Sequence, residues 1–383
     1  MSKAWDAIII GGGAAGLFCA GVAGQLGKKV LVLDHASTLG EKIRISGGGR
    51  CNFTNLHSGP ANFLSLNPHF VKSALVRYPA TEFIKLVHSY RIAYHEKHQG
   101  QLFCDDSAMQ IVEMLMAECA RGNVTIRNPV TVKSIVQEAN GWLVQTSAGI
   151  EQAQSLVMAT GGLPVPAIGA SAYSLDIAKQ FELGVVEPRP ALVPLSFTAD
   201  AFDYLQGLAG LSVSIGIESG LKGIRYGGCR FYEDVLITHK GLSGPAILQA
   251  SSYWIEGEPI RIDWLAKSDQ SGAIRCDDLF GDHDQRLKLT ETMLASLMPQ
   301  RLAKAFAEQC GLMGRKWAEV SKKDRQALKN LLTDWSVKPA GTLGWKKAEV
   351  MLGGVSTKDL DSQTMMSRKH QGLYFIGECV DVT

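Results

Sequence analysis

The sequence predicts an α/β protein built on a parallel sheet, followed by a β-rich and then a helical segment. Three observations support this prediction. An apolar run leads into a glycine-rich turn and a helix-like stretch near the N-terminus. A second apolar run follows directly, as a parallel βαβ unit requires. After residue 190 the pattern changes to short β-like runs between glycine turns, and then to helical spacing.

The βαβ unit begins with a strand predicted over Ala7–Ile10, a short apolar run typical of a strand buried on both faces. The turn that follows, residues 11–16, reads GGGAAG. A helix is predicted to about Leu26, and a second strand, Val30–Leu33, ends in Asp34. A G-x-G-x-x-G turn between strand and helix, with an acid at the end of the next strand, indicates a dinucleotide site.

Each part of this unit has a role in dinucleotide binding. Gly11 makes the tight turn, Gly13 lets the backbone approach a pyrophosphate, and Gly16 lets the helix pack on the strand. The helix N-terminus offers free N–H groups to the phosphates. Asp34 is placed to accept hydrogen bonds from the adenosine ribose. The alternative, a glycine-rich turn without a ligand, explains fewer of these features.

Three later segments favour FAD over a nicotinamide coenzyme, because an extended FAD needs contacts far apart in the sequence. Residues 40–55 contain three consecutive glycines, Gly47 to Gly49, whose bare backbone can lie against a flat ring. The segments Leu156–Gly162 and Gly372–Glu378 are predicted strands that run into glycine turns, the last with an acid. Phosphate charge or a reduced flavin could be balanced by Lys42, Arg44 and Arg50.

With these motifs the chain resembles the YhiN-like bacterial flavoproteins, also called the BaiN/RdsA family of FAD-dependent oxidoreductases. The matching segments run from residue 8 to 378 and read IIIGGGAAG, GEKIRISGGGRCNFTN, HEKHQGQLFCDDSA, LVMATGG, ALVPLSF, THKGLSGPAILQ, AEVMLGGVSTKDL and GLYFIGE. The resemblance implies a Rossmann-like FAD-binding domain of the glutathione-reductase type, with an antiparallel β-barrel and a small helical piece inserted. It also implies that Glu378 lies near the ribityl chain.

Motifs and resemblance together predict a set of FAD-binding residues. They are Gly11, Gly13, Ala14, Ala15, Gly16, Asp34, Lys42, Ser46, Gly47, Gly48, Gly49, Arg50, Cys51, Asn52, Ala159, Thr160, Gly161, Gly377 and Glu378.

The expected organisation is an FAD-binding domain over residues 1–190 and 345–383, a β-barrel over 191–272, a helical insert over 273–332 and a return to the barrel over 333–344. Family members continue with a glycine-rich turn and a helix whose N-terminus points at the flavin. This sequence stops at Asp381-Val-Thr383, so we expect a C-terminally shortened chain. The barrel strands are predicted at Leu211–Ile217, Ile224–Tyr226, Val235–Thr238 and Ile260–Trp264.

Local patterns predict further elements of the first domain. Residues 68–90 have helical spacing that Pro79 interrupts. Ser107 and Gln110 form a possible capping box for a helix that Gly122 ends. Strands are predicted at Val124–Ile126, Thr131–Gln137 and Leu143–Thr146.

Two side chains are candidates for proton transfer. Cys51 follows Arg50 in the glycine loop, and we expect the guanidinium to lower the pKa of the thiol. The alternative role for Cys51, which its small size favours, is packing in a tight loop. His239 is a candidate for contacting the substrate from the barrel, and a hydrogen-bonded structural role is its alternative.

Residues 315–329 form a basic cluster opposed only by Glu319 and Asp324. On a helical insert such a cluster is a candidate RNA-binding surface. A solvated helix face is the alternative, and the residues alone favour it. The basic residues are Arg315, Lys316, Lys322, Lys323, Arg325 and Lys329.

Three functions remain open at this point. The RdsA branch, which this sequence resembles most, reduces a uridine of large-subunit ribosomal RNA to dihydrouridine with FAD and NADH. Other branches act on small molecules such as steroid enones and aminoacetone, so an enone reductase or amine oxidase is an alternative. A non-catalytic FAD-holding, RNA-associated protein is a second one. Because we find only one dinucleotide fingerprint, NADH or NADPH is expected to visit the flavin transiently.

Composition bounds the remaining questions. The net charge is +2, so no overall field indicates nucleic acid or membrane binding. The eight cysteines form no C-x-x-C pair, and we expect reduced thiols, no metal site and a cytoplasmic protein. The uncharged stretch at residues 7–27 is long enough to span a bilayer, but its glycines indicate strand, turn and helix. The oligomeric state is left open.

Overall fold

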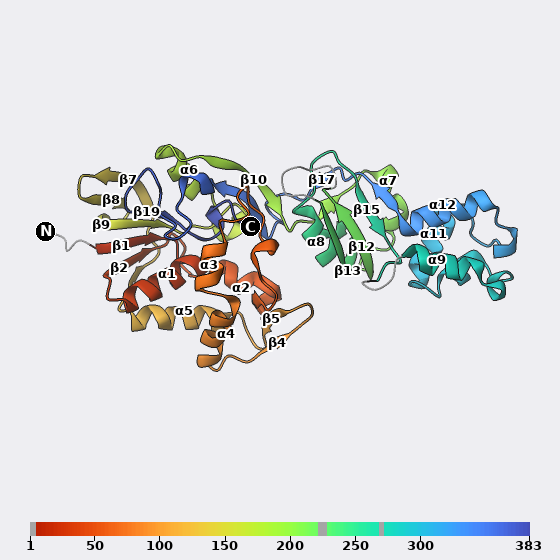
Figure 1. Ribbon diagram of the computed structural model, residues 1–383, viewed down its shortest axis with the longest axis horizontal. Helices are drawn as coiled ribbons and strands as arrows, with labels where there is room; N and C mark the ends of the chain where they lie inside the picture. The colour runs from red at the N-terminus through yellow and green to blue at the C-terminus, as the bar shows by residue number, and fades with distance from the viewer. Residues whose placement is uncertain (1–4, 221–227, 268–271) are drawn as a thin grey trace. The chain divides into compact units, whose positions relative to one another are not determined.

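The computed structural model describes residues 5–220, 228–267 and 272–383. The chain forms two compact units (Figure 1). Unit 1 comprises Met1–Arg189 and Val350–Thr383, and unit 2 comprises Pro190–Glu349. The chain therefore leaves unit 1 once and returns to it, as an insertion requires. The separate boundaries of barrel and helical insert stay predictions.

The central sheet of unit 1 is mainly parallel. Its strands are β1 (Trp5–Ile10), β2 (Val30–Leu33), β6 (Thr125–Arg127), β7 (Val132–Glu138), β8 (Gly141–Thr146), β9 (Gly149–Met158) and β19 (Leu373–Phe375). They follow the order β6-β2-β1-β9-β8-β7, and β19 pairs with the end of β9 (Figure 1). The pairs β1–β2, β1–β9, β2–β6 and β9–β19 are parallel, and β7, β8 and β9 are antiparallel neighbours. The predicted βαβ unit is confirmed.

Helices α1 (Ala14–Gln25) and α5 (Met109–Arg121) lie on the same face of this sheet (Figure 1). Their close approach depends on glycine, since a Cβ at Gly24 would lie 2.5 Å from the carbonyl oxygen of Gly122. Gly122 is also the C-cap of α5, as predicted. β2 is buried along its whole length. Buried residues of the sheet, α1 and α5 belong to one hydrophobic cluster, which is a core of unit 1.

The remaining elements of unit 1 surround the sheet. Strands β3, β5 and β4 form a small antiparallel sheet, and β10 pairs with β18. Pro79 separates α3 from α4, as predicted. These elements are α2 (Glu41–Ile45), η1 (Ser46–Gly49), β3 (Asn52–Asn55), η2 (Pro60–Asn62), α3 (Lys72–Arg77), α4 (Ala80–Ser89), β4 (Tyr94–Glu96), β5 (Gln101–Cys104), η3 (Pro166–Ile168), α6 (Tyr173–Gln180), β10 (Val185–Ala191), β18 (Val350–Val355), η6 (Thr357–Asp359) and η7 (Gly377–Cys379).

The capping box predicted at the start of α5 forms only in part. The Ser107 hydroxyl accepts a hydrogen bond from the Met109 N–H at 3.1 Å. The reciprocal bond is not made, and within the described residues the buried Oε1 of Gln110 has no hydrogen-bond partner. The helix starts at Met109 with Ala108 as its N-cap, so Ser107 and Gln110 lie one position before the N-cap and N3 positions that the motif requires.

Unit 2 contains a second sheet of seven strands, with described pairs that are antiparallel. Its strands are β11 (Leu195–Ser196), β12 (Ser212–Ser219), β13 (Cys229–Thr238), β14 (Gly241–Ser243), β15 (Ile260–Asp263), β16 (Trp335–Val337) and β17 (Gly341–Thr342). The order is β16-β15-β12-β13-β14-β11-β17. Only residues 338–340 join the two edge strands, so the sheet curls, as the predicted barrel requires. The predicted strand Ile224–Tyr226 lies outside the described residues.

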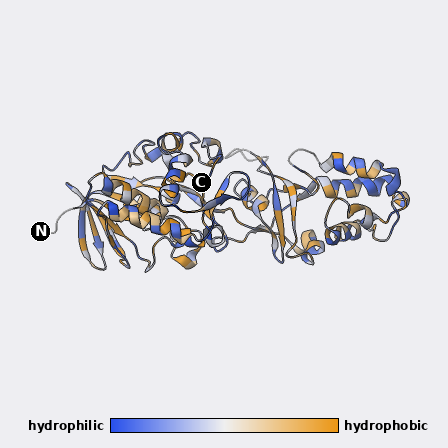
Figure 2. Cartoon of the chain, turned by 90° about the horizontal axis from the view of Figure 1, so that it is seen from below, coloured by the Kyte–Doolittle hydropathy of each residue, from blue (hydrophilic) through white to orange (hydrophobic). Residues whose placement is uncertain are grey.

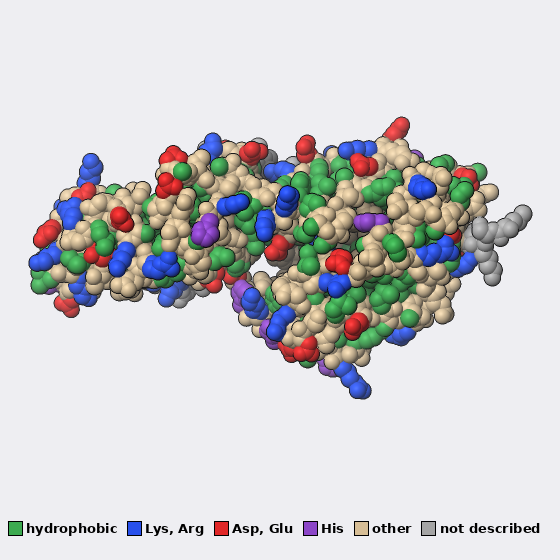
Figure 3. All heavy atoms as spheres, turned by 180° about the vertical axis from the view of Figure 1, so that it is seen from behind, with side chains coloured by type: hydrophobic (Ala, Val, Ile, Leu, Met, Phe, Trp, Pro, Cys, Tyr) green, Lys and Arg blue, Asp and Glu red, His purple; other side chains and the backbone are tan. Residues whose placement is uncertain are grey.

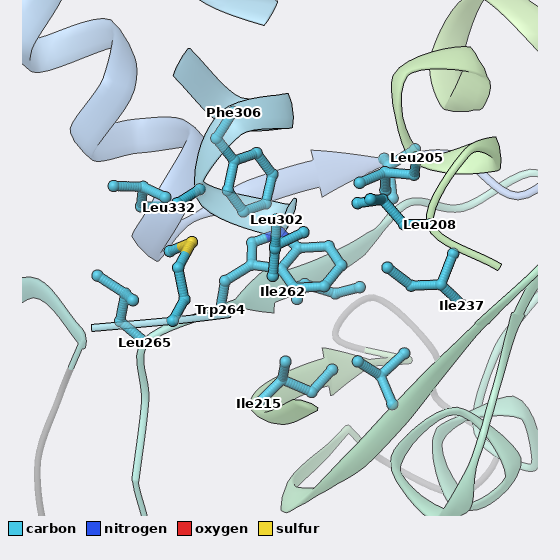
Figure 4. Packing of buried hydrophobic residues seen from close by; sticks show 14 of the residues in the cluster. Leu205, Leu208, Ile215, Ile237, Ile262, Trp264, Leu265, Leu302, Phe306 and Leu332 are labelled. Atoms are coloured by element: carbon cyan, nitrogen blue, oxygen red, sulfur yellow. The ribbon is translucent and has the colours of Figure 1, made fainter. Parts of the chain in front are cut away.

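The helices of unit 2 share one hydrophobic core with this sheet. Ile215 and Ile262 from the sheet face Phe306 and Leu332 from the helices, with Trp264 between them (Figure 4). Coloured by hydropathy, the helices carry a hydrophobic and a hydrophilic side (Figure 2). They are α7 (Ala199–Gln206), α8 (Pro245–Ser251), α9 (Gly272–Gly281), η4 (His283–Gln285), α10 (Thr290–Leu294), α11 (Gln300–Gln309), η5 (Trp317–Glu319) and α12 (Lys322–Thr333).

Candidate functional site

A cavity of about 950 Å³ lies at the carboxyl ends of β1, β2 and β9, wholly within unit 1. Gly11, Asp34 and Thr160, which follow these three strands, all line it. In open parallel sheets, ligands bind at this edge. The volume is near the upper end of the usual range of about 300–1,000 Å³ for ligand pockets, which suits a long ligand.

The glycine turn that borders the cavity has the predicted geometry. Gly11 has φ +111°, and a Cβ there would lie 2.3 Å from the Ala159 carbonyl oxygen. A Cβ at Gly16 would lie 1.9 Å from the Gly11 carbonyl oxygen, so α1 touches the turn. A Cβ at Gly13 would meet no atom within 4 Å. The turn is therefore tight on its protein side and open on its cavity side, where a pyrophosphate would bind.

Asp34 is held in place at the end of β2. Its Oδ2 accepts a hydrogen bond from the Gly12 N–H at 2.5 Å, and its Oδ1 accepts one from the Ala36 N–H at 2.7 Å. A carboxylate has further lone pairs, so these bonds orient the group without using up its acceptors. Its position on the cavity wall suits the predicted contact with ribose hydroxyls.

An ion pair joins the predicted FAD segment at residues 40–55 to the last one, Gly372–Glu378. Lys42 Nζ of α2 donates to Glu378 Oε2 of η7, and the Met351 N–H donates to Glu378 Oε1 at 2.9 Å. Both charged side chains line the cavity. Gly377, with φ +74°, supplies the left-handed turn that places Glu378 after β19.

Cys51 lines the cavity and is 6% exposed, with φ +50°. Burial raises the pKa of its thiol, and a hydrogen bond with Ser46 opposes this more weakly. The expectation that Arg50 lowers the pKa is therefore wrong. Arg50 is exposed and donates to the Asp105 carbonyl oxygen, and the loss of water around the thiol is the larger effect.

Most predicted FAD residues line the cavity, and a few do not. Gly16 packs behind the turn. Gly47, Gly48, Gly49 and Arg50 are not among the lining residues, and their contact with a flavin stays a prediction. A Cβ at Gly47 would lie 2.8 Å from the Phe103 ring, so packing alone requires glycine there. The lining residues are Gly11, Gly13, Ala14, Ala15, Asp34, Lys42, Ser46, Cys51, Asn52, Ala159, Thr160, Gly161, Gly377 and Glu378.

Several parts of the wall were not predicted from the sequence, among them Tyr78, Ala80 and Phe83 around the start of α4. Residues 130–132 follow β6, and the Val130 N–H donates to the Asp34 carbonyl oxygen at 2.7 Å. Their position beyond a third parallel strand was the available signal. Residues 168–171 line the wall from the segment before α6, and Tyr173 lines it from the first position of that helix.

The residues of the cavity fit FAD. The Tyr173 hydroxyl is buried and has no hydrogen-bond partner within the described residues, so a bound ligand could satisfy it. The open side of Gly13 accommodates a pyrophosphate, and Asp34 and Glu378 offer carboxylates to two sets of hydroxyls. A dinucleotide with a ribityl chain matches this distribution of groups.

The candidates in unit 2 have different surroundings. His239 is exposed in the turn between β13 and β14 and is not among the cavity's lining residues. Its contact with substrate stays a prediction.

Three of the six basic candidates for RNA binding are engaged within the protein. Arg325 lies over the Trp317 ring at 4.5 Å, Lys329 pairs with Asp277 at 2.5 Å, and Arg315 donates to the Glu319 carbonyl oxygen. The other three are exposed without a described partner: Lys316, Lys322 and Lys323.

The fold and the site together define the class of protein: a Rossmann-fold, FAD-dependent oxidoreductase. The model of the HI0933-like protein Rossmann domain matches residues 5–383, and the chain belongs to this family. Among the described residues, no helix is both long and apolar enough to cross a membrane.

The chain is similar to named relatives over nearly its whole length. It is 46% identical over 379 residues to the ribosomal RNA dihydrouridine synthase of Escherichia coli (strain K12), covering 99% of this chain and 92% of that protein. It is 42% identical to the protein of the same name from Haemophilus influenzae, covering 100% and 94%. It is 24% identical to the 3-dehydro-bile acid delta(4,6)-reductase of Clostridium scindens, covering 98% and 92%.

Proposed function

We propose that this protein reduces a uridine of large-subunit ribosomal RNA to dihydrouridine, with FAD as cofactor and NADH or NADPH as reductant. The observation that carries the proposal is the 46% identity, over 99% of this chain, to a ribosomal RNA dihydrouridine synthase. The cavity at the sheet edge supplies a site for the flavin that such a reduction needs. An enzyme of ribosomal RNA would act in the cytoplasm.

The reaction adds one hydride and one proton to uracil. The C5=C6 bond is conjugated to the C4 carbonyl, so C6 accepts the hydride and C5 accepts the proton as the π bond is lost. When bound, FAD supplies the hydride that NAD(P)H has delivered. The chain itself must bind and orient both partners, exclude water and provide the proton.

Cys51 is our candidate for the proton donor. Its thiol lines the cavity, and burial keeps its pKa above that of an ordinary cysteine, so the group is protonated at neutral pH. The Cys51 N–H donates to the Ser46 carbonyl oxygen at 3.1 Å, which holds the residue in the loop. Packing of the loop remains the alternative role, and the pH profile described in the Discussion distinguishes the two.

The polar residues around the cavity would hold and orient the cofactor. Asp34 would hold the ribose at one end, and Glu378, itself held by Lys42, would face the ribityl chain at the other. The N–H groups at the start of α1 would bind the pyrophosphate between them.

The test is product formation on ribosomal RNA. Protein loaded with FAD is incubated with NADH and large-subunit ribosomal RNA of Escherichia coli that lacks dihydrouridine, and nucleosides are measured by mass spectrometry. We expect dihydrouridine at a defined site. No product from FAD-loaded protein that NADH reduces would contradict the proposal, and turnover of a steroid enone instead would favour a small-molecule reductase.

A further inference from the structure

A basic surface in unit 2 extends beyond the residues that the sequence indicated. Besides Lys316, Lys322 and Lys323, it includes two exposed cations from an earlier segment, Arg286 and Lys288. We call these five residues the basic platform. On the face drawn in Figure 3, the Lys and Arg side chains at the helical end of unit 2 are interspersed with Asp and Glu side chains.

Backbone hydrogen bonds bring the two segments together. The Thr290 N–H donates to the Arg315 carbonyl oxygen, and the Trp317 N–H donates to that of Lys288, both at 2.9 Å. Leu289 and Lys316 form an antiparallel bridge between them. Arg286 and Lys288 are therefore neighbours of Lys316 in space, although nearly thirty residues separate them in sequence.

The platform rests on a buried aromatic side chain. Trp317 is 1% exposed and packs on the Phe280 ring, with centroids 4.4 Å apart. Arg325 also lies over the Trp317 ring and donates to the carbonyl oxygens of Trp317 and Val320. Arg325 thus fixes the backbone from which Lys316 projects, and the platform has a defined shape without its ligand.

The charged groups of the platform make no close ion pair within the part of the chain that the structure describes. None of its five cations has an ion-pair partner among the described residues. Ser321 caps α12, because its hydroxyl oxygen accepts a hydrogen bond from the Asp324 N–H. The Asp324 carboxylate accepts a hydrogen bond from the same hydroxyl and lies 3.7 Å from Arg315, so its charge is already opposed. Three exposed acids lie beside the platform: Glu319, Asp284, and Asp282, which interacts electrostatically with Lys288. The five cations of the platform outnumber these acids, so the local charge is positive.

Exposed apolar side chains distinguish this surface from a merely solvated one. Leu287 is 79% exposed, Leu289 38% and Met313 46%, and all three lie on or beside the two segments. Apolar side chains gathered on one surface are typical of an interaction site. Among cations, they can cover sugars and unstacked bases while the cations contact phosphates.

We propose that the basic platform binds the phosphate backbone of the ribosomal RNA substrate and is a docking surface separate from the flavin cavity. This inference rests on the proposed function, which supplies an RNA as the partner. Lys316, Lys322 and Lys323 contribute from the cluster seen in the sequence, and Arg286 and Lys288 extend it.

The test compares two triple variants in salt-dependent binding to protein-free large-subunit ribosomal RNA of Escherichia coli. The platform variant is Arg286→Gln, Lys288→Gln and Lys316→Gln. The control removes three exposed lysines of unit 1: Lys28→Gln, Lys133→Gln and Lys179→Gln. Circular dichroism and flavin absorbance report whether each variant is folded.

Each phosphate contact adds about 0.7–0.9 to the slope of log affinity against log salt. We expect the platform variant to lose about 2–3 units of slope and to bind about ten- to hundredfold more weakly at moderate salt. The control should keep the slope of the unchanged protein.

The outcomes separate this inference from the proposed function. If the unchanged protein makes dihydrouridine and the platform variant keeps the full slope, the platform does not bind the RNA, although the proposed function is supported. If the unchanged protein does not bind the RNA, both fail. Loss of binding to anionic lipid vesicles, with RNA binding intact, would also overturn the platform as an RNA surface.

Discussion

At Gly13 the backbone leaves open space on the side where a cofactor phosphate would bind. A Cβ there meets no protein atom within 4 Å, whereas at Gly16 it would lie 1.9 Å from a carbonyl oxygen. Glycine at position 13 therefore leaves room for the ligand, whereas glycine at position 16 allows the helix to pack against the turn. Sequence alone predicted both roles, because the spacing of the motif fixes which glycine faces which partner.

These two glycines make a matched pair of variants. We expect Gly13→Ala to fold normally but to bind FAD at least tenfold more weakly, about 1.4 kcal/mol, because the methyl group occupies the phosphate position. Gly16→Ala should instead lower the free energy of unfolding of the FAD-free protein. Flavin fluorescence titration and urea unfolding measure the two effects, and normal FAD affinity in Gly13→Ala would place the pyrophosphate elsewhere.

Cys51 shows where a residue-level prediction failed. The neighbouring Arg50 suggested a lowered pKa, but the guanidinium is directed to the Asp105 carbonyl oxygen and the thiol is buried. Burial from solvent raises the pKa of the thiol. The residues that are adjacent in the sequence do not show which side chain the fold will bury.

The raised pKa predicts the pH dependence of a proton donor. The neutral thiol is the active form, so dihydrouridine formation should be constant through neutral pH and fall as pH rises past the thiol's raised pKa. Cys51→Ala should lower product formation by about 10²–10⁴-fold and remove this alkaline limb. Product formed at the normal rate, with the limb retained, would assign Cys51 to packing.

At the scale of elements, periodicity predicted the sheet of unit 1 well. β1, α1 and β2 lie close to the predicted positions. A strand that is buried on both faces has a continuous apolar run, and turn residues mark where each element ends. The wall segments at 130–132 and 168–171 escaped prediction, because their place at the cavity depends on tertiary packing and not on a local pattern. Cys51 and Arg50 likewise needed the packed loop to be placed.

The Lys42–Glu378 pair links α2 to η7 and tests whether the ends of the chain meet at the cofactor. We expect Glu378→Ala to weaken FAD binding about tenfold or more, because a carboxylate facing the ribityl chain is lost and Lys42 is left unpaired. Glu378→Gln, which keeps an acceptor for the Met351 N–H, should have a smaller effect. FAD affinity is measured by flavin fluorescence. Equal affinities in the unchanged protein and in both variants would show that Glu378 does not contact the cofactor.

For the whole molecule, each of the two units has its own core. The resemblance predicted the insertion, but not that the sheet and helices of unit 2 would share one hydrophobic cluster. A shared core forms when apolar faces of segments that are distant in the sequence pack together. A helical pattern predicts that a helix has an apolar face, but not which element that face packs against. The helical segment is therefore part of the core and not an independent module.

Phe306 tests this shared core. It is 0% exposed and contacts Trp264 across the interface between α11 and the sheet, with centroids 5.4 Å apart. Phe306→Ala should destabilise unit 2 by about 3–5 kcal/mol through the cavity it leaves. Flavin absorbance should persist, since the cavity belongs to unit 1. Tryptophan fluorescence during urea unfolding measures the first effect, and an unchanged midpoint would exclude a shared core.

Both the proposed site and the proposed reaction require a flavin bound in the cavity of unit 1. The most direct measurement is the visible spectrum of the protein purified with FAD, recorded without oxygen before and after NADH is added. We predict a bound flavin spectrum that NADH bleaches and that large-subunit ribosomal RNA then restores. Protein that stays colourless with excess FAD would contradict the site, and a bound flavin that NADH never reduces would contradict the proposed reaction.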